Sequence, residues 1–175
     1  MILGMSIETF TQLHVWISLV GIATGFIVAY GLLTNNRMPA WTAVFLVTTI
    51  ATSVTGFMFP LVKVGPPHIV GAISLVVLAF TLVALYVRKL SGSWRWVYAS
   101  TAVLALYLNV FVLVVQAFLK VPFLHQFAPL GNEPPFAAAQ GVTLLLFVWL
   151  GFAALKRFHP EAPAVTVPRA GAMPT

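Results

Sequence analysis

The feature that most constrains this chain is a series of five long apolar stretches. A helix of roughly 20 apolar residues spans the ~30 Å hydrocarbon core of a bilayer. Long apolar runs without period-2 alternation indicate helices, because in lipid the backbone must satisfy its own hydrogen bonds. The sequence therefore predicts an all-α integral membrane bundle, with spans near residues 13–34, 41–61, 67–88, 95–120 and 136–157.

Helix-breaking residues separate these stretches. Prolines 60, 66 and 67 end the second span and delay the third, because proline removes a backbone donor and restricts the residue before it. The connection 121–135 is rich in proline and is expected to include a short interfacial helix around Leu124–Phe127. We expect one transmembrane bundle over residues 1–158, followed by a disordered, proline-rich cytoplasmic tail over 159–175.

The composition excludes several kinds of chemistry. The chain has no cysteine, and its only acidic residues are Glu8, Glu133 and Glu161. Disulfides, thiolate sites, carboxylate-rich Ca²⁺ or Mg²⁺ sites and most two-carboxylate hydrolases are therefore excluded. A phosphate loop, a Gly-x-Ser-x-Gly motif and an HExxH motif are also absent, which argues against a soluble enzyme. Whether the chain catalyses any reaction stays open.

The basic residues predict the orientation of the bundle. The connections on the side of the C-terminus hold seven of the nine Lys and Arg residues, and the other side holds only Lys63 and Lys120. Positive residues favour the cytoplasmic side, so the N-terminus is expected in the periplasm of a bacterial inner membrane. The net charge of +6 is interpreted as this topology signal, and no nucleic-acid partner is expected. The seven residues are Arg37, Arg88, Lys89, Arg95, Lys156, Arg157 and Arg169.

The rare polar side chains gather on the predicted periplasmic side. Polar groups within lipid are costly and tend to face the interior of a bundle. These residues therefore predict a polar pocket that opens to the periplasm. Of the histidines and glutamates, only His159 and Glu161 fall on the other side. The periplasmic group comprises His14, His68, His125, Glu8, Glu133, Gln116 and Gln140.

A cofactor would suit such a pocket, because neutral imidazoles bind haem iron, copper and zinc. His14 and His68 are candidate axial ligands of a haem b on facing helices. Gly21, Gly25 and Gly71 would then leave room for the porphyrin.

Two other ligands stay open for the same pocket. A copper or zinc ion could be held by several imidazoles and a carboxylate, with amide side chains orienting the ligands. A quinone could instead accept hydrogen bonds from His68 or Gln116. The metal ligands would be His14, His68 and His125 with Glu133 or Glu8, and the orienting residues Gln116, Gln140 and Asn109.

Some stretches of the chain resemble known proteins. The segments 106–122 and 133–141, with Thr55-Gly56, Phe59-Pro60 and Pro67-His68, are similar to a group of small uncharacterised bacterial inner-membrane proteins. The resemblance covers about residues 14–158 and implies no established activity. In architecture alone, the chain resembles cytochrome b561-like four-helix bundles. Their paired histidines at both membrane faces are missing here, so at best one haem near the periplasmic face is implied.

Two functions of other kinds compete with ligand binding. The chain could be a non-catalytic accessory subunit of a larger membrane complex, or a homo-oligomer, that packs through its small-residue faces. A carrier for a small solute ranks third, because the sequence shows no inverted repeat and no intramembrane charge suited to proton coupling. The first prediction remains a periplasm-facing pocket that binds a haem, a metal ion or a quinone-like ligand.

Overall fold

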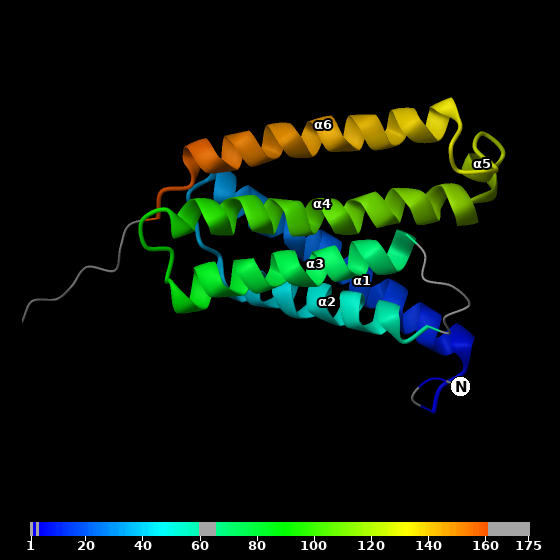
Figure 1. Cartoon of the computed structure of the whole chain (residues 1–175), viewed down its shortest axis with the longest axis horizontal. Coiled ribbons are helices and arrows are strands. Elements are labelled where there is room, and N and C mark those ends of the chain that lie inside the picture. Colours follow the sequence, from blue (N-terminus) through cyan, green and yellow to red (C-terminus); the bar gives the residue numbers. More distant parts are fainter. Residues whose placement is uncertain (1, 3, 60–65, 161–175) are drawn as a thin grey trace, which may run out of the picture.

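The described part of the chain is helical throughout its regular structure. It comprises residues 2, 4–59 and 66–160 of a computed structural model (Figure 1). Five helices are long and apolar enough to cross a membrane, which confirms the predicted all-α bundle and indicates a multi-pass membrane protein. The helices are α1 (Ile7–Leu33), α2 (Pro39–Phe57), α3 (Pro66–Leu82) with its π-helical continuation η1 (Val83–Val87), α4 (Trp94–Lys120), α5 (Pro122–His125) and α6 (Pro134–Arg157).

Helix caps explain two differences from the predicted boundaries. α1 begins before the expected start near residue 13, because the Ser6 hydroxyl accepts a hydrogen bond from the Thr9 N–H. α5 (Pro122–His125) overlaps the expected short helix around Leu124–Phe127 and begins two residues earlier, because proline fits the first turn of a helix. Most of the expected tail lies outside the described residues, which end at Pro160.

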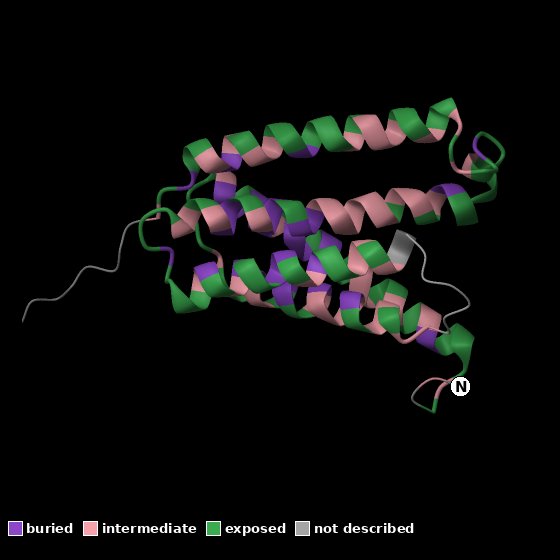
Figure 2. Ribbon diagram, viewed as in Figure 1, coloured by how far each residue is buried: buried purple, intermediate pink, exposed green. Residues whose placement is uncertain are grey.

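α4 holds the bundle together. It contacts α1, α3 and α6, while α2 packs against α1 and α3. α6 runs along α4 at the outer edge of the bundle (Figure 1). Buried positions, purple in Figure 2, occur along α1, α2, α3 and α4, whereas α6 buries only Phe147 and Ala154 among its described residues. α6 is therefore the most peripheral of the long helices.

Two glycines bring α1 close to its neighbours. A Cβ atom on Gly25 would lie 2.5 Å from Leu106 Cδ1 of α4 and 2.9 Å from the Phe45 ring of α2. A Cβ on Gly21 would lie 3.2 Å from the Thr48 hydroxyl of α2. Gly21 and Gly25, four residues apart on α1, therefore serve helix packing, because glycine lets helix backbones approach one another.

The two ends of the bundle differ in charge. One end, here called the histidine end, carries the start of α1, α3 and α6 and the end of α4, and Lys120 is the one basic residue there within the described part of the chain. We call the opposite end the basic end. The predicted orientation of these ends relative to the two sides of the membrane stays a prediction. The basic end holds Arg37, Arg88, Lys89, Arg95, Lys156 and Arg157 among the described residues.

Candidate functional site

His14 is fixed between α1 and α2 at the histidine end. Its Nδ1 lies 2.7 Å from the Thr55 hydroxyl oxygen. That hydroxyl also lies 2.7 Å from the Ala51 carbonyl and 3.2 Å from the Thr52 carbonyl, both of which can accept its single proton. When Thr55 donates to one of these carbonyls, its oxygen accepts from the His14 ring, and the neutral imidazole then carries its proton on Nδ1. In that tautomer the Nε2 atom has a lone pair that can accept a hydrogen bond or bind a metal.

Each of the two predicted histidines in the first three helices contacts a phenylalanine ring. The His14 ring meets Phe59 edge-on, with ring centroids 5.3 Å apart, and Phe59 in turn contacts Phe10. His68, at the start of α3, lies 6.0 Å from the Phe57 ring. The end of α2 thus lies in contact with both histidines, through two different phenylalanines. His14 and His68 therefore each contact an aromatic ring at the same end of the bundle.

The other predicted residues belong to the α4–α6 side of the histidine end. His125 Nδ1 lies 3.3 Å from the Phe118 carbonyl, so this side chain holds α5 against α4. Gln140 donates to the Phe111 carbonyl at 3.1 Å and joins α6 to α4. Gln116 is exposed. The contacts of His125 and Gln140 are therefore with the backbone of α4 rather than with His14 or His68.

Glu133 is engaged by the loop before α6. Its two carboxylate oxygens accept the backbone N–H groups of Leu130 at 2.8 Å and Asn132 at 3.0 Å. The hydrogen bond from Leu130 is the largest cause that holds the pKa of Glu133 below its usual range, because it favours the charged form. Through these two hydrogen bonds, the carboxylate holds the loop before α6 in place.

The fit of a metal ion or a haem can be tested on these positions. Within residues 2, 4–59 and 66–160, no three His, Asp or Glu side chains lie together as a set that could hold a metal ion. The space expected for a porphyrin is also occupied. Leu106 and Phe45 fill the side of Gly25, and a Cβ on Gly71 would lie 3.2 Å from the Phe57 ring. The glycines therefore do not fit the porphyrin role that the sequence suggested.

Polar residues of α2 face two neighbouring helices. Thr49 is fully buried and accepts a hydrogen bond from the Asn109 amide of α4 at 3.2 Å. This interhelical bond explains Asn109 structurally. On the α1 side, the Thr52 hydroxyl oxygen is buried and makes no hydrogen bond within the described residues, and the same is true of Gln140 Oε1. A buried polar atom of this kind can serve a ligand or a water.

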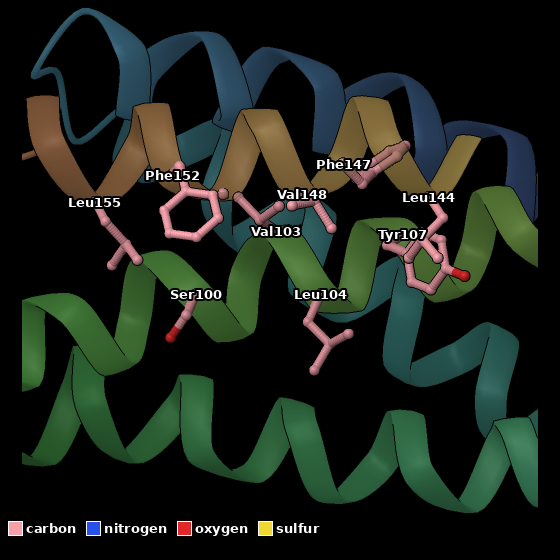
Figure 3. Close-up of a pocket in the computed structure, with 10 residues that line it drawn as sticks. Ser100, Val103, Leu104, Tyr107, Leu144, Phe147, Val148, Phe152 and Leu155 are labelled. Atoms are coloured by element: carbon pink, nitrogen blue, oxygen red, sulfur yellow. The ribbon is translucent and has the colours of Figure 1, made fainter. Parts of the chain in front are cut away.

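A surface cavity that sequence reasoning missed lies between α4 and α6, and it is open along much of its length, with only Val103 and Phe147 of its lining buried (Figure 3). It measures about 300 Å³, and its lining is almost entirely apolar. The side chains run from Ser100 and Leu155 at one end to Tyr107 and Leu144 at the other (Figure 3). The one feature of the sequence that could have indicated it is Gly151, a small residue among the bulky side chains on the same face of α6.

Comparison with known proteins finds no match: no family model fits the chain, and neither a curated protein nor a solved structure is significantly similar to it. The resemblance to small bacterial inner-membrane proteins therefore stays a prediction. What is established is a helical bundle with five apolar helices long enough to cross a membrane, which supports embedding in a lipid bilayer.

Proposed function

We propose that this membrane protein binds a quinol-type ligand at the histidine end, with His14 as its principal contact. The observation that carries the proposal is the hydrogen bond between His14 and Thr55. It holds the ring in one orientation and, in the tautomer in which Nδ1 donates to Thr55, makes Nε2 an acceptor. A hydroxyl group of a reduced quinone is a donor that matches this atom.

The surroundings of His14 favour a flat apolar ligand. The Phe59 ring contacts both the His14 ring and the Phe10 ring, at centroid distances at which aromatic rings pack against one another. His68, whose ring lies 6.0 Å from that of Phe57 at the same end of the bundle, is the second contact that we propose. Ligand pockets of this type combine apolar walls with a few placed polar groups.

This assignment ranks quinol above the other two ligands. A metal ion needs several converging ligands, and the described residues bring together no such set. A haem needs the volume that Phe45, Leu106 and Phe57 occupy. A single imidazole acceptor beside aromatic rings is sufficient for a hydroxyl donor. Gln116 and Glu133 have no role in this proposal, because one is exposed and the other is engaged by its loop.

The proposal makes a specific demand on redox state. With Nε2 as the proposed acceptor, the reduced form with its hydroxyl groups should bind more tightly than the oxidised form with its carbonyls. A short-chain ubiquinol analogue and its oxidised form can be compared by titration calorimetry of the protein in mild detergent. We expect tighter binding of the quinol by about tenfold, the worth of roughly 1.4 kcal/mol, which is within the range of one hydrogen bond.

Matched histidine variants test the location. His14→Ala and His68→Ala should abolish quinol binding, whereas His159→Ala should leave it unchanged. His159 is exposed at the opposite end, and it contacts Asn35 through its backbone rather than its side chain. Equal loss in all three variants, or equal binding of quinol and quinone, would contradict the proposal. A Soret band in the purified protein would show that the bound ligand is a haem rather than a quinol.

A further inference from the structure

We propose that the cavity between α4 and α6 binds one acyl chain of an anionic phospholipid, whose phosphate lies against the cations of the basic end. This cavity, called the α4–α6 groove below, is separate from the proposed quinol site, which lies at the other end of the bundle. Its lining is apolar apart from Ser100 and the Tyr107 hydroxyl. A groove of this kind suits a hydrocarbon chain better than a polar solute.

The groove has the length of one leaflet. Its α6 lining extends from Leu144 to Leu155, which corresponds to about 16 Å of helix at ~1.5 Å per residue. Half of a roughly 30 Å hydrocarbon core is about 15 Å. An acyl chain in the groove would therefore reach from the middle of the bilayer to its surface.

The mouth of the groove lies at the basic end. Ser100 of α4 and Leu155 of α6 are the lining residues closest to that end. Lys156 and Arg157 follow Leu155 directly, in the last turn of α6. The lipid phosphate would thus meet cations where the apolar lining stops.

The start of α4 continues the same stripe towards the surface. Trp96 lies one turn before Ser100 at i, i+4 spacing and is exposed. The Arg95 guanidinium lies over the Trp96 ring, 5.5 Å from its centroid. This stacking places a cation and an interfacial aromatic ring beside the groove, the pairing expected at the level of lipid headgroups.

Charge complementarity selects an anionic lipid. The described residues of the basic end include six Lys or Arg and no carboxylate, since Glu8 and Glu133 lie at the histidine end and Glu161 falls outside the described residues. A phosphodiester without a compensating ammonium group therefore gains more than a zwitterionic one. Basic sites between transmembrane helices are suited to such headgroups.

Glycine variants on α6 test the groove. A Cβ on Gly151 would have Val103 Cγ1 as its nearest contact, at 3.9 Å, so a larger side chain enters the groove without a clash at its base. A Cβ on Gly141, on the same helix, meets nothing within 4 Å and does not line the groove. Gly151→Leu should displace the acyl chain, and Gly141→Leu is its matched control.

The measurement is native mass spectrometry of the detergent-purified full chain, titrated with phosphatidylglycerol or phosphatidylcholine of equal chain length. We expect preferential binding of one phosphatidylglycerol to the wild type and to Gly141→Leu, and its loss in Gly151→Leu. The double variant Arg95→Gln/Lys156→Gln should weaken that binding by roughly 25-fold, about fivefold for each cation. Lys120→Gln, at the histidine end, should have no effect.

Three outcomes would overturn the proposal. These are equal affinity for the two lipids, equal binding by Gly151→Leu and Gly141→Leu, or a co-purifying membrane protein whose release by Gly151→Leu shows that a helix occupies the groove. If Gly151→Leu proves unfolded, as judged by helicity and elution volume, the lipid binding of the charge variants tests the proposal instead. They leave the apolar lining intact, so an unchanged lipid preference in the double variant would also refute the proposal.

Discussion

Gly25→Ala should destabilise the bundle at the point where three helices meet. The new methyl group would lie 2.5 Å from Leu106 Cδ1 and 2.9 Å from the Phe45 ring, both below van der Waals contact. Leu106 and Phe45 are each only 1% exposed, so neither side chain has open space into which it can move. The clash must therefore be relieved by moving α1 away from α2 or α4, which loosens their packing.

The magnitude follows from two opposing contributions. Overpacking of a well-packed core costs typically about 1–3 kcal/mol. Replacing glycine by alanine within a helix contributes about 1 kcal/mol in the opposite direction. Gly141→Ala receives the same helix contribution, but its methyl group enters open space. The helix contribution cancels between the two variants, so Gly25→Ala should be less stable than Gly141→Ala by about 1–3 kcal/mol.

The assay is reversible unfolding in mixed micelles with increasing denaturing detergent, followed by far-ultraviolet circular dichroism. The wild type, Gly25→Ala and Gly141→Ala are compared under identical conditions. A Gly141→Ala curve at or above the wild type, with Gly25→Ala below both, is the expected order. Equal stability of the two variants would show that α1 does not approach α2 and α4 as closely as described, and would refute the packing argument.

Three further predictions concern polar contacts. A double-mutant cycle of Asn109→Ala and Thr49→Ala should give a coupling of about 0.6 kcal/mol, typical of an interhelical hydrogen bond in a membrane, and no coupling would contradict the contact. Glu133→Gln should lower the thermal midpoint at pH 7, and this difference should shrink on acidification: the folded pKa of Glu133 is depressed, so its stabilisation is complete above the unfolded pKa and is lost as the pH falls through the folded pKa. A difference that stays the same as the pH is lowered through that range would exclude the carboxylate charge as the cause. Asn35→Ala should speed backbone hydrogen exchange at His159, whose N–H donates to Asn35 Oδ1 at 2.7 Å, while Asn132 exchange stays the same.

The candidate site was only partly accessible to sequence reasoning. The periodicity of α1 and the polar positions of α2 could be read along each helix, because helical spacing alone determines which residues share a face. The pairing of His14 with Thr55 could not, since it depends on how far each helix is rotated about its own axis. For the same reason, the sequence suggested room for a porphyrin beside Gly25, whereas Leu106 and Phe45 occupy that space in the structure.

What the sequence determined by itself is the class of the protein. Five apolar stretches of spanning length can satisfy their backbone hydrogen bonds in lipid only as helices, so the bundle follows from local composition. The tertiary structure alone decided the partners of the polar groups and the position of the α4–α6 groove. The reason is physical: lipid is as apolar as the side chains, so hydropathy does not specify which helix faces pack together. That choice depends instead on the close contacts at Gly21 and Gly25 and on hydrogen bonds such as the one from Asn109 to Thr49.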